Sequence, residues 1–393
     1  MQKGVMYLGK DITIHQPGSG GKNGWVLGDR DNTLVYTDQN WKPKKGTTND
    51  IGGWGQVVRS NNLPSVLTYD ATERAVTVAA PNGSGGTYTV GSAAEFAALA
   101  LRYQLDEANS LKFANGDANL NAAQTVNLTA DVNDLENIGI TGFQRDVSNT
   151  AAVSVTLNGR KDLTVTLPDI PVYTGGNNHD RQGLFTKTTN LTASNVTVNG
   201  KITAHAGSAL YIGALCAEAT GTATLEKVTG NTETLVDAEP NNTYGIWDGR
   251  IAGILATSPN VSFTDCEWTG SIVESTKSDC ALGGFYARNN ERQDTTIFVK
   301  NGRISGKIQK TESKDNAIVG GLAASLRDNG THKLTIDGLT VDGLTITTNA
   351  NVASGGLLGY EWPNTTATIT GVSVKNSTLN AGSNARFGGL VYT

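Results

Sequence analysis

The chain has 393 residues, of which 47 are glycine and 17% are charged, and its formal net charge is −5. One compact core rarely grows to this length, so the chain either divides into domains or builds its core by stacking. Many glycines with few charged residues favour short strands and tight turns over helices. A negative chain without a basic block argues against a nucleic acid or an anionic membrane surface as partner.

The first 85 residues differ in composition from the rest of the chain. They contain three of the six tryptophans, Trp25, Trp41 and Trp54, together with several glycine clusters. Side chains alternate between apolar and polar at 11–15 and at 74–78, which is typical of half-buried strands. We therefore predict that residues 1–85 form a small β-rich domain, or β-structure that caps a second domain over residues 86–393.

One helix is predicted, over residues 92–103. Ser92 and Glu95 have the spacing of a capping box, in which each side chain bonds a backbone N–H group of the first turn. Phe96, Leu99 and Tyr103 follow on one face. An amphipathic helix at this place can cover the open end of a stacked fold. The stretch 124–131 is predicted as the first strand after it, and the residues up to about Pro171 as irregular early coils.

Clear repeats begin near residue 182. Each repeat carries a small residue, a glycine and an apolar residue, at 182–185, 212–216, 252–256, 282–286, 319–323, 354–358 and 387–391. The apolar residue after the glycine falls at positions 184, 215, 254, 285, 322, 357 and 390, so the steps are 31, 39, 31, 37, 35 and 33 residues. A roughly constant period of this size predicts stacked supersecondary units. The Gly-Gly pairs are predicted to mark a tight bend where a Cβ atom would crowd the neighbouring unit.

Each repeat also contains segments that alternate with period two. Such segments lie at 195–199, 261–264, 296–300, 333–337 and 367–370, and further ones at 302–308 and 338–346. Three short strands per unit of 31–39 residues predict one coil of a parallel β-helix, whose inward side chains form apolar ladders. A β-propeller blade would need four strands and about 40–45 residues, and a β-sandwich is the other alternative. The predicted fold class is all-β, a right-handed parallel β-helix with an N-terminal capping helix.

The three cysteines are Cys216, Cys266 and Cys280, and none has CxxC spacing. They are interpreted as small apolar core residues, with a Cys266–Cys280 disulfide as the alternative. Their spacing does not favour a structural zinc site. No metal or cofactor is expected.

The segments 89–100 and 125–132, a helix followed by a strand, resemble the start of the β-helical regions of large bacterial surface proteins with GLUG-type repeats. The Gly-Leu-apolar-Gly signature of those repeats is matched best at 356–359, and in part at 321–324 and 389–391. Only Gly359 keeps the final glycine. The resemblance implies an extracellular adhesin or stalk protein and transfers no catalytic residue. Because the chain shows no signal peptide at residues 1–10 and its last residues lie within a repeat, we expect it to be part of a longer protein.

Parallel β-helices can also carry polysaccharide lyases and glycosidases, and glycoside hydrolysis needs two carboxylates about 5–10 Å apart across a sugar. The best candidates are Asp248 and Glu361, each beside an aromatic residue, although a solvated surface group is the simpler interpretation. His15, His179, His205 and His332 are scattered, and the polar cluster 177–181 is interpreted as an exposed loop. We predict no catalytic residues, with a carbohydrate-active enzyme as the alternative.

Ligand binding is the leading hypothesis. Large loops are predicted between Glu226 and Arg250 and between Arg288 and Thr296, and insertions on one face of a solenoid often form its binding surface. Aromatic and acidic residues in the repeats and loops are the candidate ligand contacts: Trp247, Asp248, Trp268, Tyr286, Tyr360, Glu361 and Trp362. The expected partner is a host or microbial glycan or protein, and the expected state is a monomer without membrane insertion. A pure spacer without ligand is a third possibility.

Overall fold

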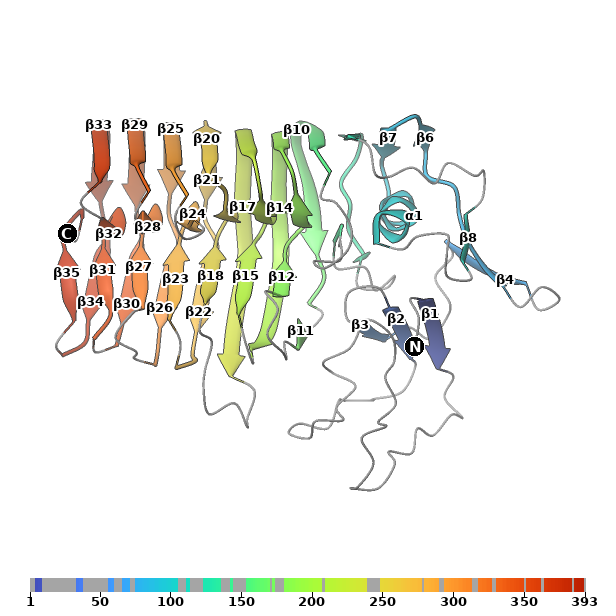
Figure 1. Cartoon of the computed structure of the whole chain (residues 1–393), viewed down its shortest axis with the longest axis horizontal. Helices are drawn as coiled ribbons and strands as arrows, with labels where there is room; N and C mark the ends of the chain where they lie inside the picture. Colours follow the sequence, from blue (N-terminus) through green and yellow to red (C-terminus); the bar gives the residue numbers. More distant parts are fainter. Residues whose placement is uncertain are drawn as a thin grey trace, which may run out of the picture.

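The structure is a computed structural model, and it describes residues 4–8, 33–37, 56–59, 66–70, 75–104, 111–113, 123–135, 142–143, 153–169, 172–173, 180–206, 209–238, 248–277, 279–289, 293–312, 317–326, 330–349, 351–361, 364–383 and 385–391. The described residues form a parallel β-solenoid of about six turns, in which successive coils lie side by side along one axis (Figure 1). The predicted fold class is therefore confirmed.

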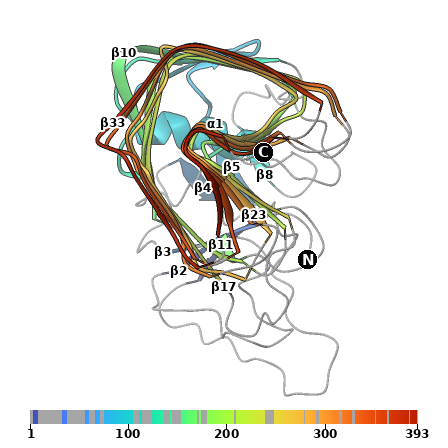
Figure 2. The ribbon, with the colours of Figure 1, turned by 90° about the vertical axis from the view of Figure 1, so that its left-hand side faces the viewer.

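From β12 onward, successive coils contribute strands to three sheets that run along the stack (Figure 2), and one of these sheets also includes the earlier strands. The seven-stranded sheet holds β12 (Asp180–Gln182), β15 (Leu210–Gly213), β18 (Gly249–Ala252), β23 (Cys280–Gly283), β27 (Ile318–Gly320), β31 (Ala353–Gly355) and β35 (Arg386–Gly388). The six-stranded sheet holds β13 (Phe185–Thr188), β16 (Cys216–Ala219), β19 (Leu255–Thr257), β24 (Tyr286–Arg288), β28 (Ala323–Leu326) and β32 (Leu358–Glu361).

The 16-stranded sheet, here the long sheet, wraps around the rest of each coil. Its main path comprises β6 (Gly83–Ser84), β7 (Thr87–Val90), β9 (Gln124–Leu128), β10 (Val155–Leu167), β14 (Leu191–Ala206), β17 (Thr222–Ala238), β20 (Asn260–Thr264), β25 (Thr295–Ile304), β29 (His332–Asp342) and β33 (Thr365–Lys375). Beside it lie β11 (Val172–Tyr173), β21 (Glu267–Trp268), β22 (Ser271–Glu274), β26 (Lys307–Lys310), β30 (Thr345–Thr348) and β34 (Thr378–Ala381).

Strand register confirms the alignment of the repeats. Phe185 pairs with Cys216, Cys216 with Leu255, and Leu255 with Tyr286, so the apolar residues that precede them stack in one column. The column continues through the Tyr286–Ala323 and Ala323–Leu358 pairs and the Leu358–Val391 bridge. Every step equals the spacing read from the sequence. Extra residues in the longer repeats therefore lie outside the paired strands.

The Gly-Gly pairs mark the corner between the seven-stranded and six-stranded sheets, as predicted. A Cβ atom on Gly283 would lie 1.8 Å from the backbone oxygen of Tyr286, across the bend of the same coil. One on Gly284 would lie 2.3 Å from the backbone oxygen of Gly321, in the next coil. The first glycine of the pair thus permits the bend, and the second permits the close approach of neighbouring coils.

A second bend recurs in the long sheet, where one residue of each coil has a positive φ angle. These residues occupy one register position, with φ between 52° and 86°, and are Asn195, Lys227, Asp265, Asn301, Gly338 and Gly371. Asparagine, aspartate and glycine tolerate this left-handed conformation best, and a lysine does so at a cost. Lys227 is therefore the strained member of the column.

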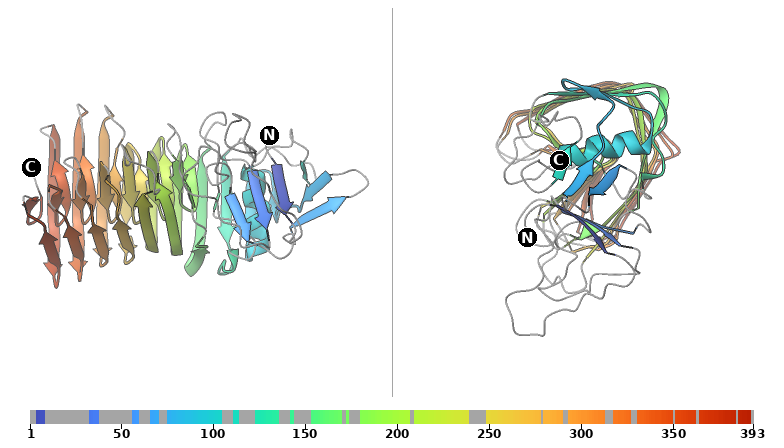
Figure 3. Two further views of the ribbon diagram at one scale, coloured as in Figure 1. Left: turned by 90° about the horizontal axis from the view of Figure 1, so that it is seen from below. Right: turned by 90° about the vertical axis from the view of Figure 1, so that its right-hand side faces the viewer.

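Helix α1 (Ala93–Gln104) covers the N-terminal end of the stack (Figure 3). Ser92 Oγ accepts a hydrogen bond from the Glu95 N–H group at 3.2 Å, and the Glu95 side chain accepts one from the Gly91 N–H group at 2.7 Å. The capping box is confirmed, with the glutamate bonding one residue earlier than usual. Phe96 packs on Phe143, with ring centroids 4.6 Å apart, and Phe143 stacks on Phe185.

The helix is buried more fully than an amphipathic surface helix, since all residues from Phe96 to Leu101 are buried. It contacts β5 (Ala75–Val78) as well as β7. In the N-terminal region, β5 forms a three-stranded sheet with β4 (Leu67–Asp70) and β8 (Leu111–Phe113), while β1 (Gly4–Leu8), β2 (Thr33–Thr37) and β3 (Gln56–Arg59) form another. The described residues of 1–85 lie mostly in strands, and the helix lies between them and the first coil.

One prediction about the coils needs correction. The loop predicted from Glu226 to Arg250 is wrong over its first half, because β17 continues to Ala238. Thr232 and Thr234 occupy buried positions of this strand in place of apolar residues, so the apolar alternation is interrupted and the segment was mistaken for a loop. In the early coils, β10 is a 13-residue strand with a register shift between Asn158 and Leu163, which is the kind of irregularity expected there.

Candidate functional site

At the Gly-Gly corner, outward side chains of the seven-stranded sheet pack against outward side chains of the six-stranded sheet. We call this contact the seam. Its first section consists of Arg181, Tyr211, Glu218, Asp248, Arg250 and Arg288, which we call the charged section. Its second section consists of Ala281, Ala287, Ile318, Ala324 and Ala353, which pack together and which we call the alanine section. Among the described residues, the charged section is the largest cluster of buried ionisable side chains, and it is therefore the candidate site.

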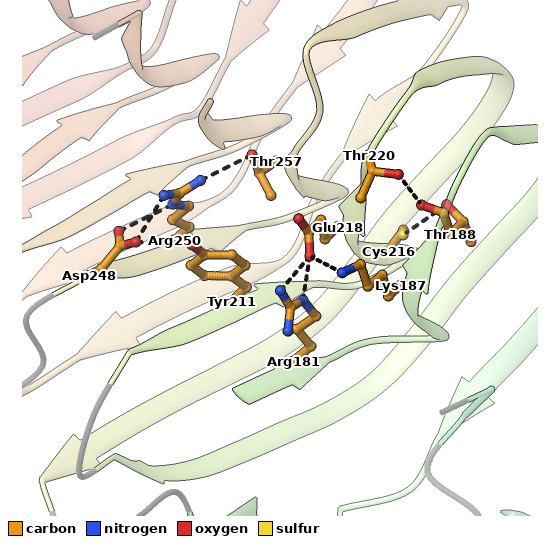
Figure 4. A network of polar contacts seen from close by, with 10 residues as sticks. All are labelled: Arg181, Lys187, Thr188, Tyr211, Cys216, Glu218, Thr220, Asp248, Arg250 and Thr257. Atoms are coloured by element: carbon orange, nitrogen blue, oxygen red, sulfur yellow. Dashed lines mark hydrogen bonds and ion pairs between the residues drawn. The ribbon is translucent and has the colours of Figure 1, made fainter. Parts of the chain in front are cut away.

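Strand register positions the charged section. Arg181, Tyr211 and Arg250 occupy equivalent places in β12, β15 and β18, so they stack one above another on the outer face. The Arg250 guanidinium carbon lies 4.3 Å from the centre of the Tyr211 ring, and that of Arg181 lies 5.3 Å from it. The tyrosine is thus held between two cations (Figure 4), an arrangement in which the ring face attracts positive charge.

Asp248 is the centre of one ion-pair group. Its carboxylate accepts hydrogen bonds from Arg250 at 2.8 and 3.2 Å and from the Tyr211 hydroxyl at 2.9 Å. Arg288, from the neighbouring coil, donates a further bond to it. Burial alone would raise the pKa of Asp248, but the two guanidinium charges outweigh it and hold that pKa well below its usual range. The same burial raises the pKa of Tyr211.

Glu218 is the centre of the second group. It accepts a hydrogen bond from Arg181 Nε at 2.6 Å, and the Lys187 ammonium lies 3.7 Å away (Figure 4). Burial opposes the ionised form of Glu218, but the charges of Arg181 and Lys187 lower its pKa below the ordinary value. Arg250 joins the two sheets by donating to Thr257 at 3.3 Å. Ion pairs therefore join the coil of Arg181 to that of Glu218 and the coil of Asp248 to that of Arg288, and the Tyr211 hydroxyl links the two groups.

This arrangement does not suit acid–base chemistry. A general acid needs a pKa near the working pH, whereas both carboxylates are stabilised in the ionised form. Asp248 and Glu361 also lie three coils apart, which is about 14 Å along the stack at the usual strand spacing. That exceeds the roughly 5–10 Å over which two carboxylates act on one glycosidic bond. The contacts of the charged section hold neighbouring coils in place.

A second buried ion pair lies inside the solenoid. Lys310 Nζ and Glu274 Oε2 are 2.5 Å apart, and neither side chain is exposed to solvent. They are neighbours in β26 and β22, and Lys310 also donates to the Thr276 backbone oxygen. A buried pair of this kind contributes little net stability but is costly to break. Since it is enclosed by the core, this pair is structural.

Two of the predicted ligand contacts are wrong, because their side chains are fully buried. Trp268 fills the interior of its coil, where a Cβ atom on Gly253 would lie 2.0 Å from the indole nitrogen and one on Gly284 would lie 2.6 Å from the ring. Tyr286 is also enclosed and donates a hydrogen bond to the Ser258 backbone oxygen at 2.8 Å. A side chain without exposed area cannot contact a ligand on the outer surface.

Of the remaining predicted contacts, the structure places two along the seam. Asp248 belongs to the charged section, and half-buried Tyr360 packs beside the alanine section. Trp247, Trp362 and the Glu361 side chain lie outside the described residues.

Among the histidines, His332 is buried in β29 and His205 pairs with Asp237, while His15 and His179 lie outside the described residues.

The cysteines behave as predicted. Cys216, Cys266 and Cys280 are all buried thiols, so the alternative disulfide is not formed. Burial raises the pKa of Cys216 and of Cys266 to about 12, which leaves both unreactive at neutral pH.

The charged section was missed in the sequence because charged residues are usually exposed. A signal was nevertheless present. Arg181 and Tyr211 each stand two residues before the marker glycine, and Arg250 stands at the aligned position of its repeat. Aligning the repeats at this position predicts that the side chains of Arg181, Tyr211 and Arg250 stack on one another.

Comparison of the chain with models of known protein families, with curated proteins and with solved structures found no match. The fold defines the class, a parallel β-solenoid repeat protein. Within the described residues, no group of three or more histidine, cysteine, aspartate or glutamate side chains could hold a metal ion. The part of the chain described here also contains no helix long and apolar enough to cross a membrane.

Proposed function

We propose that this chain is a non-enzymatic segment of a bacterial cell-surface or secreted protein, an adhesin or stalk that binds a host or microbial glycan or protein. The observation that carries the proposal is the constant strand register across repeats of unequal length. Steps of 31 to 39 residues leave the paired strands unchanged, so the additional residues are available for loops on a rigid support. Rigid solenoids with variable loops are common binding scaffolds.

The proposed contact region is the part of the chain next to the seam. Trp247 is joined directly to Asp248, which two arginines and a tyrosine hold in place. Trp362 follows β32, whose Tyr360 packs at the alanine section. Aromatic side chains beside a fixed backbone can stack on a sugar ring or fill a pocket of a protein partner at low entropic cost.

The proposal is tested by probing arrays of host and microbial glycans and of host surface proteins with the purified chain. We expect specific binding to at least one ligand, and we expect the double variant Trp247→Ala/Trp362→Ala to lose it while keeping its circular dichroism spectrum. Lys300→Ala, in the exposed part of β25 on the long sheet, is the matched control and should bind like the parent.

Two outcomes would contradict the proposal. Release of new reducing ends or of unsaturated uronates from a polysaccharide panel would favour the alternative, a carbohydrate-active enzyme. An array without any bound ligand would favour a pure spacer. The buried and doubly paired state of Asp248 is what disfavours the enzyme.

A further inference from the structure

One ion pair of the described residues is completely enclosed by the solenoid. Lys310 Nζ lies 2.5 Å from Glu274 Oε2, and neither side chain has exposed area. Because the two residues are register partners in β26 and β22, the pair joins two successive coils. In the other lysine–carboxylate pairs that the structure describes, the lysine keeps at least 22% of its side chain exposed. An amine and a carboxyl group are therefore in contact here without access to water.

The two oxygens of the Glu274 carboxyl group have different surroundings. Oε1 accepts hydrogen bonds from the Thr276 N–H group at 2.6 Å and from the Thr276 hydroxyl. Oε2 lies beside the Lys310 amine and accepts no hydrogen bond of ordinary geometry from the described residues. Two donors directed at one carboxyl oxygen stabilise the negative charge that develops there when a nucleophile attacks the carbon. Thr276 therefore provides Glu274 with an oxyanion hole, and Oε2 is in the position of a leaving group.

The amine of Lys310 is held by the same residue. Its Nζ donates a hydrogen bond to the Thr276 backbone oxygen, just after the end of β22. Thr276 thus fixes both reacting groups, the amine through its carbonyl and the carboxyl group through its N–H and hydroxyl. Reactants held in contact at favourable angles behave as if they were present at about 10⁵–10⁸ M. Such proximity favours a condensation that the same groups do not undergo when they are separate in water.

Enclosure also favours a product without charge. Two buried ions carry a desolvation penalty that their mutual attraction does not always offset. When one proton passes from the ammonium to the carboxylate, both groups become neutral, and an amide formed from them is neutral as well. A site closed to water also protects that amide from hydrolysis.

We propose that Lys310 and Glu274 condense to an intramolecular amide, an isopeptide bond between two coils. The bond between Nζ and the Glu274 carboxyl carbon forms, and the bond from that carbon to Oε2 breaks. Oε2 leaves as water with two hydrogens of the ammonium, and the third stays on the amide nitrogen and keeps its hydrogen bond to the Thr276 backbone oxygen. The reaction needs no oxidant, reductant or cofactor. It is a self-modification of the scaffold, independent of the proposed ligand binding.

The test is the mass of the purified full chain after denaturation, which we expect to lie one water molecule below the mass of the sequence. After tryptic digestion, residues 251–277 and 308–314 should be recovered as one branched peptide, because trypsin does not cleave after an acylated lysine. The exposed pair of Lys201 and Asp169, whose Nζ and Oδ2 atoms are 2.9 Å apart across two coils, is the internal control and should stay unlinked.

Two results would overturn the proposal. One is a full-length mass equal to that of the sequence, with the two peptides recovered separately. The other is a water loss located elsewhere, such as a succinimide at Asp337-Gly338. Both results are read from the unmutated protein, so the test does not depend on the folding of a variant.

Variants then assign the roles of the residues. Lys310→Arg keeps the positive charge beside Glu274 but replaces the amine by a guanidinium, and it should have the full mass. Thr276→Val keeps the N–H and backbone oxygen and removes the hydroxyl donor from Oε1. We expect it to form the cross-link at least about tenfold more slowly, measured as the linked fraction against time after cell-free synthesis. Persistent water loss in Lys310→Arg would contradict the proposal, and an unchanged rate in Thr276→Val would contradict the role of Thr276 as a positioning residue.

Discussion

The two sections of the seam are closed by opposite chemistry although they belong to the same two sheets. In the charged section, arginine, tyrosine and carboxylate side chains fill the contact and neutralise one another. In the alanine section, which begins in the coil directly after that of Arg250, the same register column holds Ala281, Ile318 and Ala353, and these side chains carry no charge. Repetition of the backbone therefore does not require repetition of the side chains, provided that every coil matches its immediate neighbours.

The difference also predicts different vulnerability. Buried ion pairs add little net stability but leave a costly unpaired charge when one partner is removed. The alanine section has no charged partner that a substitution could remove. It should instead be destabilised by substitutions that add side-chain volume. Three substitutions and an acid titration test this contrast.

Removing the central carboxylate should have the largest effect. Asp248→Ala leaves the guanidinium groups of Arg250 and Arg288 buried beside one another without their shared anion. We expect a loss of about 3–5 kcal/mol in the free energy of unfolding, measured by denaturant titration. Asp342→Ala, which breaks an exposed pair with Lys375, is the control and should change little. If both variants lower the free energy of unfolding equally, the ion pairs of the charged section contribute no more than an exposed pair.

Enlarging the alanine section should cost less. Ala324→Leu adds three carbon atoms at a fully buried position between the two sheets, and we expect a loss of about 1–3 kcal/mol from overpacking. The same substitution at exposed Ala381 tests the general effect of a leucine and should be close to neutral. If Ala324→Leu does not lower the free energy of unfolding, the alanine section is packed less tightly than its full burial indicates.

Acid should weaken the charged section selectively. The folded-state pKa values of Asp248 and Glu218 lie below their ordinary values. Their contribution to stability is therefore complete above the unfolded-state pKa values of about 4, and it is lost as the pH falls toward the folded values. We expect the free energy of unfolding, measured between pH 6 and pH 3, to fall less steeply in Asp248→Asn than in the parent. Ala324→Leu should keep the slope of the parent.

The smallest expected effect is a gain within a coil that contributes to the charged section. Lys227 has a positive φ angle in a column otherwise filled by asparagine, aspartate and glycine. Lys227→Asn should raise the free energy of unfolding by roughly 0.5–1 kcal/mol, as seen by a shifted denaturation midpoint. Because residues 227 and 248 share no partner, the gain should add to the loss in Asp248→Ala. A non-additive result would reveal coupling between the long sheet and the seam.

Much of the fold could be predicted from the sequence because it depends on a few strict local requirements. The marker glycines are required wherever a Cβ atom would meet a backbone oxygen, so they survive in repeats that share little else. Their spacing predicted the register of the corner column correctly. The period-two segments and the capping box were also sufficient, since both report local backbone geometry.

The site was less predictable because burial of a polar side chain depends on what lies opposite it. Trp268 and Tyr286 were assigned to the surface since aromatic residues near loops suit ligand binding, yet glycines in neighbouring coils make room for Trp268 inside. Arg181 and Glu218 are 37 residues apart, and only the coil register brings them within 2.6 Å. Such pairs can be identified once the columns are known, and not before.

The hydrogen bonds that join the coils run along the axis of the stack, which determines how the molecule responds to tension. A force that pulls the two ends apart acts parallel to these bonds and loads them one ladder at a time, so the coils should peel away singly at low force. Each coil of 33 residues would release on the order of 110 Å of extended chain. We therefore expect the solenoid to lengthen under load in steps of one coil, which pulling on single molecules would measure.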